Sequence, residues 1–264
     1  MATKTKRTRD TGDLVERIGD KIVLASELEE PPVFLIYGRS GQMKTRTACT
    51  APKPLLIDVN EKGSRSTRRD LNPHVIRVTH WNELSDIYWF LESGEHDFKT
   101  WILDGVTSMA NLAMKFVLGD EASRDASRDP DMPTRPAWGK LGELMKTQIL
   151  NYRNLPMYGV FTALERARIV GDEGDLEGEL VIGPSVSPAV GQALEQNVSH
   201  IGHISKREVR VKVKGTGEIR KVVRTELLIG GTSERYATKD RDGVLDDVVI
   251  NPNLTDMIRQ LEGE

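Results

Sequence analysis

The sequence predicts an α/β fold in which helices cover both faces of a mostly parallel β-sheet, and three observations lead to this expectation. Short apolar runs without polar alternation recur along the first two-thirds of the chain, as in strands that are buried on both faces. Segments with helical periodicity separate these runs. The last third instead contains alternating runs around a Gly-rich turn, which is typical of an antiparallel β-hairpin. Strands that alternate with helices favour three layers.

The expected strands and the first helices follow in order along the chain. Two segments, residues 81–93 and 138–155, repeat apolar side chains at intervals of three and four, and therefore predict amphipathic helices. Five shorter runs have the length and composition of buried strands. These runs are residues 33–37, 55–59, 75–78, 101–104 and 157–162.

The C-terminal third changes character. A Ser-Pro pair, which suits a helix start, opens residues 187–197. The alternating hairpin covers residues 207–229, and a capped helix covers residues 251–264. Because we see no clear boundary inside residues 30–264, we expect one domain there, preceded by a basic N-terminal arm and lead-in at residues 1–29.

Composition excludes several kinds of protein. No apolar run approaches the roughly 20 residues of a membrane span, so we expect no membrane partner. The single Cys49 excludes an internal disulfide and a cysteine-based zinc site, and it suits a reducing cytoplasm. His200 and His203 fit an ordinary strand better than a metal site. The net charge is only −3, so any nucleic-acid contact must come from local clusters.

Residues 36–48, IYGRSGQMKTRTA, nearly spell the phosphate-binding loop G-x-x-x-x-G-K-[ST]. As the motif requires, they follow an expected strand and open an expected helix. Backbone N–H groups of the loop can then point at phosphates. The Lys44 ammonium would reach the β- and γ-phosphates, and the Thr45 hydroxyl would ligate Mg²⁺. The expected nucleotide-binding residues are Gly38, Arg39, Ser40, Gly41, Gln42, Met43, Lys44 and Thr45.

Met43 occupies the position where the motif has glycine. Glycine there permits a positive φ or a close approach of backbone to phosphate. A Met in the left-handed conformation costs about 1–2 kcal/mol, which a folded domain tolerates. Because the backbone N–H of Met43 remains available to a phosphate, we expect the substitution to weaken or reshape the loop rather than abolish it. An ordinary glycine-containing turn is the alternative.

A phosphate site also needs a carboxylate that holds the Mg²⁺ shell. The segment TWILDGVTS supplies Asp104 at the end of an apolar strand, with a helical pattern after it. An Asp in this place is equally suited to capping a helix. With the phosphate loop upstream, we expect Asp104 to support the metal together with Thr45.

In their order and spacing, these motifs resemble the RecA/RadA-like P-loop ATPases, specifically the small phage single-strand-annealing ATPases of that group. The resemblance covers about residues 30–262. It implies a RecA-like P-loop NTPase core of three layers that binds ATP and Mg²⁺. The matching segments are IYGRSGQMKT, LLIDVNEKG, WILDGVTSM, RPAWGKLGELM, GVFTALER and YATKDRDG.

The resemblance also implies a catalytic acid and a sensor. Glu61, just past the second strand, would activate water, although Asp58 and Asn60 lie close in sequence. If Asn60 took the catalytic position, hydrolysis would be slow. Thr162 would sense the γ-phosphate, and a β-branched core residue is the alternative interpretation.

Lys239 and Arg241, in TKDRDG, correspond to a Lys-x-Arg element that in these families reaches a neighbouring subunit's ATP. In an extended segment the two cations project to the same side. They could then neutralise charge on a transferring phosphoryl group. This role requires self-association into a ring or filament. A polar turn is the alternative.

The hairpin carries the expected DNA contacts. In EVRVKVK, cations alternate with valines, so one face is apolar and the other basic. A row of cations at strand spacing suits a phosphate backbone, and a solvated sheet edge is an equally good interpretation. The polar loop at residues 119–136 lies where the family places DNA-binding loops, whereas residues 171–179 are acidic. The cations considered are Arg210, Lys212, Lys214, Arg220 and Arg224.

The function expected from these features is an ATP-dependent, single-stranded-DNA-binding recombination ATPase of phage type, acting in the cytoplasm of a bacterial host. A nucleotide-binding assembly module with little hydrolysis is the first alternative, because Met43 and the catalytic acid depart from the usual pattern. A small-molecule kinase on a P-loop scaffold is the second.

Overall fold

The structure is a computed structural model that describes residues 17–19, 21–28, 30–125, 129, 132–170, 179–212, 218–230 and 235–263. It divides into two units, Met1–Glu30 and Pro31–Glu264. In the described part of the first unit, Ala25–Glu27 forms a short 3-10 helix, η1. The basic arm expected at the start of the chain lies outside the described residues. Every element that follows belongs to the second unit.

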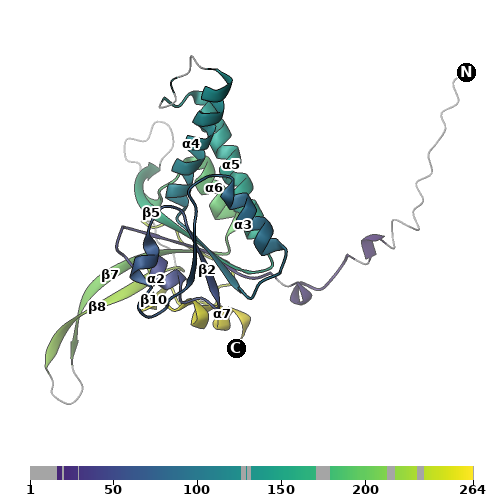
Figure 1. Ribbon diagram of the computed structural model, residues 1–264. Coiled ribbons are helices and arrows are strands. Elements are labelled where there is room, and N and C mark those ends of the chain that lie inside the picture. The colour runs from purple at the N-terminus through teal and green to yellow at the C-terminus, as the bar shows by residue number, and fades with distance from the viewer. Residues whose placement is uncertain are drawn as a thin grey trace, which may run out of the picture. The chain divides into compact units, whose positions relative to one another are not determined.

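The second unit is built on a mixed sheet with the strand order β10-β8-β7-β1-β5-β4-β2-β3 (Figure 1). Off this path, β6 pairs with β5 and β9 pairs with β7. All neighbours from β7 to β3 are parallel, which confirms the predicted sheet. The strands are β1 Val33–Gly38, β2 Pro54–Asp58, β3 His74–Arg77, β4 Thr100–Asp104, β5 Tyr158–Val170, β6 Glu179–Pro184, β7 His200–Lys212, β8 Ile219–Leu228, β9 Lys239–Asp240 and β10 Val248–Ile250.

Helices cover both faces of this sheet and complete the three layers. One hydrophobic cluster joins the sheet to α3, α4, α5 and α6, and a second joins its other face to α2 and α7. A short 3-10 helix, η2, follows β2. The helices are α2 Lys44–Ala48, η2 Gly63–Ser66, α3 Glu83–Glu92, α4 Val106–Arg124, α5 Arg135–Arg153, α6 Pro188–Asn197 and α7 Leu254–Glu262.

The central strands supply both clusters, which explains their apolar runs. Every residue of β1 is buried. Leu35 and Tyr37 pack into the cluster under α3 to α6, whereas Phe34 and Ile36 pack into the cluster under α2 and α7. Both faces of the strand therefore need apolar side chains, and polar alternation would place polar groups in one of the two cores.

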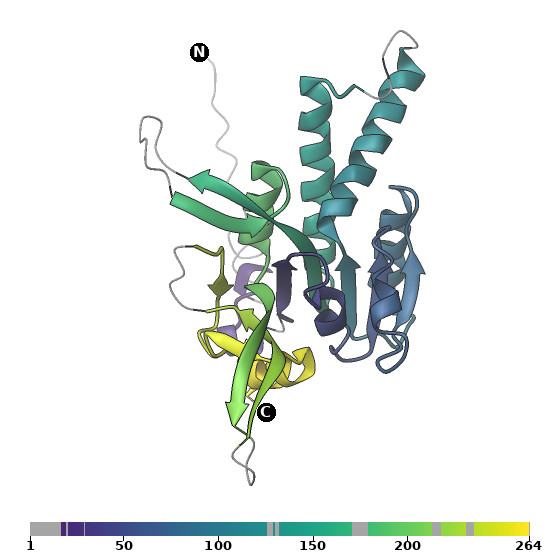
Figure 2. The same cartoon turned by 90° about the vertical axis from the view of Figure 1, so that its left-hand side faces the viewer.

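The structure corrects the expected loop at residues 119–136. Helix α4 continues to Arg124, and α5 begins at Arg135, so the connection is much shorter than the sequence suggested. An ion pair of 3.1 Å between Lys140 and Glu121 joins the two helices. The Thr134 side chain caps α5 by accepting from Ala137 N. Figure 2 shows α4 and α5 rising side by side beyond the sheet.

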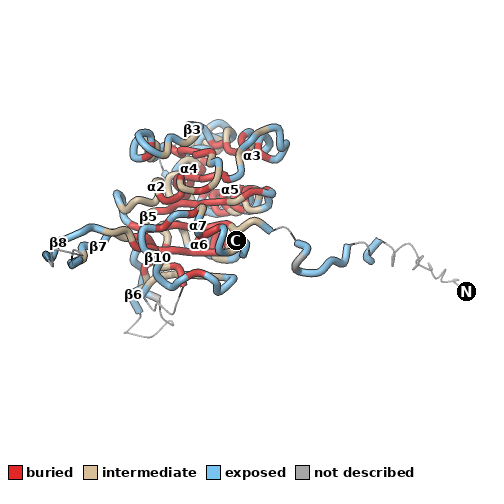
Figure 3. Tube along the Cα trace, turned by 90° about the horizontal axis from the view of Figure 1, so that it is seen from below, coloured by how far each residue is buried: buried red, intermediate tan, exposed pale blue. Residues whose placement is uncertain are grey.

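Two antiparallel hairpins extend from the sheet. Strand β5 continues to Val170 and pairs with β6, around the acidic segment whose residues 171–178 are outside the description. The predicted C-terminal hairpin is confirmed, but its first strand, β7, starts at His200. Residues from His200 to Ile204 are buried in the sheet, and those from Arg207 onward form a largely exposed arm (Figure 3).

In the described part of the chain, no helix combines the length and the apolar character that spanning a bilayer requires.

Candidate nucleotide-binding site

Polar residues meet where the central parallel strands end. The register pairs Asp58 of β2 with Asp104 of β4, and Asp104 with Thr162 of β5. All three are buried. In open α/β sheets, ligands bind at the carboxyl ends of the strands. These residues therefore lie at the position that the fold offers to a ligand.

The phosphate loop connects β1 to α2 beside them. Gly41 has φ 78° and Met43 has φ 74° and ψ 13°, so Met43 adopts the left-handed conformation that glycine favours. The Met43 side chain packs against the cluster under α2 and α7, which offsets part of the backbone strain. Gly38 is needed for space, because a Cβ there would collide with the Ile204 carbonyl oxygen.

Lys44 folds back over this loop. Its Nζ donates to the carbonyl oxygens of Gly38 at 3.0 Å and Arg39 at 2.9 Å. Burial lowers the pKa of Lys44, and the nearby carboxylates of Asp104, Glu61 and Glu165 oppose that shift. Among the residues that the structure describes, no carboxylate accepts a hydrogen bond from the ammonium. A phosphate is therefore a well-suited partner for it.

Asp104 is hydrogen-bonded from both sides. The Thr45 hydroxyl donates to Asp104 Oδ2 at 2.8 Å, and the Thr162 hydroxyl donates to Asp104 Oδ1. Burial raises the pKa of Asp104; the two hydroxyl bonds oppose this, and Glu61 and Asp58 add to it. A cation beside these oxygens would favour the charged carboxylate. The donor set of carboxylate and hydroxyl oxygens fits Mg²⁺, with Thr45 and Asp104 as the residues that would hold it.

The segment after β2 is fixed by Asp58. Its Oδ1 accepts from the backbone N–H groups of Glu61 and Lys62, each at 2.9 Å. Asn60 and Lys62 have positive φ values of 61° and 55°, which fold the chain back toward the phosphate loop. Asp58 Oδ1 is thus occupied with backbone, whereas the Glu61 carboxylate accepts from the Ser108 hydroxyl.

Two glycines let these groups come close together. A Cβ on Gly63 would collide with Asp104 Oδ2 and lie 2.7 Å from Thr45 Oγ1. A Cβ on Gly105 would lie 3.1 Å from Thr162 Oγ1 and 3.5 Å from Glu61 Oε1. The peptide bond between Asp104 and Gly105 is cis. Glycine backbone therefore lies directly against Asp104 and Thr45 at Gly63, and against Thr162 and Glu61 at Gly105.

These groups line one cavity of about 380 Å³. The predicted residues in its lining are Lys44, Thr45, Glu61, Asp104 and Thr162, together with Ser40, Gly41 and Met43 of the loop. Gly38, Arg39 and Gln42 support the loop from outside the cavity. Residues that the sequence did not single out also line it: Arg46, Lys62, Gly63, Arg65, Ser66, Gly105, Ala163 and Leu164.

The loop is fastened to neighbouring strands by contacts that the sequence did not reveal. The Gln42 Oε1 atom accepts from the Lys206 backbone N–H at 2.6 Å. Glu165 accepts from Arg39 Nε at 2.9 Å and pairs with His203 Nε2 at 2.8 Å. Burial raises the pKa of Glu165, but the bonds with His203 and Arg39 outweigh it and the pKa is lowered. No local motif connects the loop to these strands, because Gln42 and Lys206 are 164 residues apart and Arg39 and Glu165 are 126 residues apart.

Lys239 and Arg241 lie away from the nucleotide cavity of their own chain. Lys239 Nζ donates to the carbonyl oxygens of Glu195 and Val198, at 2.6 and 2.7 Å, at the C-terminal end of α6. Arg241 donates to the Gln196 carbonyl at 3.4 Å. Burial and then the charge of Arg241 lower the pKa of Lys239. Within one chain, the two cations therefore cap α6.

The segment that carries these two cations is anchored by a buried histidine. His200 Nδ1 lies 3.1 Å from Asp240 Oδ1, and His200 Nε2 lies 3.1 Å from Asp242 Oδ2. Burial lowers the pKa of His200, and the two aspartates oppose this shift. His200 also stacks on Phe34 of β1, with ring centroids 4.8 Å apart. The structure thus gives His200 a role that strand periodicity alone did not suggest.

The hairpin cations do not form one basic face. The register places Arg210 beside Lys221, whereas Arg220 lies beside Val211 in the next pair, on the other face. Arg220 pairs with Glu218 at 2.9 Å, and Arg224 pairs with Glu226 at 2.6 Å. Lys214 lies outside the described residues. Arg220 and Arg224 of the return strand therefore lie on the other face of the hairpin from Arg210 and Lys212, and both pair with carboxylates.

A strand, a phosphate loop with its lysine and hydroxyl, and an aspartate at the end of another parallel strand of the same sheet together define a P-loop NTPase. The chain belongs to the AAA domain family, whose model matches residues 30–241. No curated protein matches the sequence. Among solved structures it is similar to a KaiC-like protein from the hyperthermophilic archaeon Pyrococcus horikoshii OT3. That similarity has 13% identity and a TM-score of 0.40, covering 75% of this chain and 85% of that one.

Proposed function

We propose that this protein is an ATPase that binds single-stranded DNA and acts in phage-type recombination. The observation that carries the ATPase part is the convergence of Lys44, Thr45, Asp104 and Glu61 on one cavity. The family membership supports nucleotide binding. The DNA and recombination parts rest on the sequence resemblance.

The residues divide the work of hydrolysis. Backbone N–H groups of the loop and the Lys44 ammonium bind the β- and γ-phosphates, which takes Lys44 from the carbonyls of Gly38 and Arg39. Thr45 and Asp104 hold Mg²⁺, which neutralises phosphate charge when bound. Glu61 orients the attacking water and accepts its proton, and Ser108 positions the Glu61 carboxylate. Thr162 orients Asp104.

Lys239 and Arg241 complete the site in trans. The two cations of one subunit would meet the ATP of its neighbour in a ring or filament, where they stabilise charge on the transferring phosphoryl group. Within one chain both cations donate to carbonyl oxygens at the end of α6, so reaching a neighbour's ATP would require them to release these bonds. Assembly and hydrolysis would then depend on each other.

The test is ATP turnover with and without single-stranded DNA, in the wild type, Lys44→Ala and Glu61→Gln. We expect DNA-stimulated turnover, lost in both variants, with ATP binding kept in Glu61→Gln. Loss of a general base lowers turnover by about a hundredfold or more. Tight ATP binding without turnover in the wild type would instead favour the assembly module. Phosphorylation of a metabolite by a monomer would favour the kinase.

A further inference from the structure

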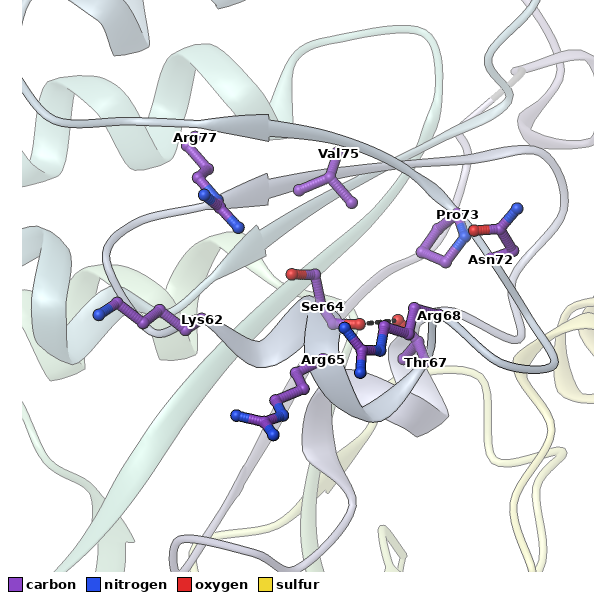
Figure 4. A pocket seen from close by; sticks show the side chains of 9 residues that line it. All are labelled: Lys62, Ser64, Arg65, Thr67, Arg68, Asn72, Pro73, Val75 and Arg77. Atoms are coloured by element: carbon purple, nitrogen blue, oxygen red, sulfur yellow. Dashed lines mark hydrogen bonds between the residues drawn. The ribbon is translucent and has the colours of Figure 1, made fainter.

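A second and larger cavity, of about 680 Å³, lies beside the nucleotide site. Four cations line it: Lys62, Arg65, Arg68 and Arg77 (Figure 4). The rest of its lining is two hydroxyl residues, an asparagine, a proline and a valine. We call it the basic cavity. No carboxylate is among its lining residues, so its electrostatic potential is positive.

The four cations keep their positive charge unpaired within the described part of the chain. None of them forms an ion pair with a residue that the structure describes. The two carboxylates of this segment have other partners, since Glu61 accepts from Ser108 and Asp70 pairs with Arg46. This differs from the hairpin, where Arg220 and Arg224 have carboxylate partners. The basic cavity is therefore ready for an anionic ligand.

The shape of the cavity limits what that anion can be. Lys62, Arg65 and Arg68 come from the turn around η2, and Arg77 comes from β3, which Figure 4 shows passing above that turn. Strand β3 is the last of the sheet and is exposed along its length, so the cavity is open at the sheet edge. No aromatic side chain lines it, so it offers no stacking platform for a base. The cavity instead offers four positively charged side chains, and it is open to solvent at the sheet edge.

We propose that the basic cavity binds the phosphodiester backbone of single-stranded nucleic acid, without reading its sequence. The inference rests on the proposed function and gives it a location that differs from the hairpin. Guanidinium groups suit this role, because their planar fork binds two phosphate oxygens at once. Three guanidinium groups and one ammonium in one open cavity match a chain of phosphates better than a compact metabolite, which would need further groups to recognise its uncharged part.

The basic cavity also shares part of its wall with the nucleotide site. Lys62 and Arg65 line both cavities. Between them in sequence, Gly63 lies directly against Asp104 and Thr45. A metal and nucleotide that enter between Thr45 and Asp104 therefore meet the same backbone that carries two of the four cations. Nucleotide occupancy would change the positions of Lys62 and Arg65, and with them the affinity for the phosphodiester chain.

The test removes the two cations that line only the basic cavity. Binding of a fluorescent oligothymidylate is measured by anisotropy over a series of salt concentrations, with and without nucleotide, for the full chain and for Arg68→Ala/Arg77→Ala. The slope of log K against log salt is negative, and each lost phosphate contact reduces its magnitude by about 0.7. For the double variant we therefore expect the magnitude of the slope to fall by about 1.4. We also expect an affinity loss of about tenfold or more. Arg69→Ala, in the same segment but outside the lining, should leave both unchanged.

The outcomes separate this inference from the proposed function. If the double variant binds the oligonucleotide like the wild type while Arg210→Ala/Lys212→Ala loses it, the DNA site is the hairpin and the inference is wrong. Binding of inorganic tripolyphosphate is measured by calorimetry. If the double variant loses tripolyphosphate binding but keeps oligonucleotide binding, the cavity binds a free polyphosphate and the inference is also wrong. A wild type that binds no oligonucleotide in any nucleotide state overturns the proposed function itself. Unchanged ATP affinity shows that the double variant is folded.

Discussion

The two neighbouring cavities of this protein are built in opposite ways. In the nucleotide cavity, Asp104 and Thr162 are buried and hydrogen-bonded at the ends of central strands. In the basic cavity, the cations are exposed and lie on a turn and on the last strand of the sheet. Buried polar groups need partners, so the first arrangement is rigid before any ligand arrives. Exposed cations can rearrange, so the second can follow an irregular chain of phosphates.

This difference means that a substitution in the nucleotide cavity should cause a large loss of ATP affinity and leave oligonucleotide binding unchanged. A substitution in the basic cavity should reduce oligonucleotide affinity in small steps that depend on the salt concentration. A residue on the shared wall should affect both. Four substitutions, taken from the largest expected effect to the smallest, test how far the comparison holds.

Lys44→Ala should separate the two cavities most clearly. Removing the ammonium eliminates two or more charge-assisted bonds to phosphate, which corresponds to a loss of about a hundredfold in ATP affinity. Oligonucleotide affinity without nucleotide should stay the same, because Lys44 does not line the basic cavity. Titration with a fluorescent nucleotide measures the ATP affinity, and anisotropy of a labelled oligonucleotide measures the oligonucleotide affinity. The exposed Lys53→Ala is the matched control. Equal losses for both ligands would mean that the two sites are one.

Gly63→Ala should affect the shared wall. A methyl group there collides with Asp104 and presses on Thr45, so either these two side chains or the turn must move. Overpacking of this kind costs about 1–3 kcal/mol, so Mg²⁺-dependent ATP affinity should fall about tenfold. Oligonucleotide affinity should change as well, because Lys62 and Arg65 move with the turn. Gly139→Ala in α5, where a methyl group meets open space, is the control. A change confined to the nucleotide would show that the two cavities are independent.

Thr162→Val should shift a pH dependence. The Thr162 hydroxyl bond lowers the Asp104 pKa against the raising effect of burial, so its loss raises that pKa further. Mg²⁺ binds the deprotonated carboxylate, so the midpoint of Mg²⁺-dependent ATP binding should move to higher pH. The pKa of Asp104 in the folded protein lies above its unfolded value. The stability that the neutral Asp104 carboxyl contributes is therefore lost as pH rises through the folded pKa. Thr162→Val should lose more unfolding free energy than the wild type over this rise in pH.

The control for this variant is Thr100→Val, at the other end of β4. Thr100 is also buried and donates to the Pro52 carbonyl at 2.8 Å. Both variants should lose about 1–2 kcal/mol of unfolding free energy, measured by denaturant titration. Only Thr162→Val should move the midpoint of the pH profile. A shift in both would show that the effect is a general loss of stability rather than a change at Asp104.

Met43→Gly should have the smallest effect. Relief of the left-handed strain gains about 1 kcal/mol, and loss of the packed side chain removes a similar amount, so ATP affinity should remain within about twofold or improve slightly. The comparison variant is Gly41→Ala, at the other loop residue with a positive φ, 78°. Its added methyl group has nothing to pack against, so the folded protein should lose about 1 kcal/mol of unfolding free energy. Thermal unfolding with and without ATP measures both. A sharp loss in Met43→Gly would show that the loop needs the Met side chain itself.

The sequence predicted the fold and the nucleotide cavity because both depend on local patterns. Unalternated apolar runs predicted the strands of the sheet core, and the loop motif with Asp104 predicted residues that line one cavity. The basic cavity has no such pattern. Arg68 and Arg77 come together only because β3 crosses over the turn around η2, and the sequence shows neither that crossing nor which cations keep carboxylate partners. The hairpin shows the converse, since its row of cations was visible but its ion pairs were not.

The hydrogen bond between Gln42 and the Lys206 backbone N–H has a mechanical consequence. The register between β7 and β1 reaches only as far as His203, and just beyond it β7 leaves the sheet to become the exposed arm. Gln42, a residue of the phosphate loop, holds the strand at that point of departure. A displacement of the loop would therefore either break this bond or move the β7 backbone where the exposed arm begins.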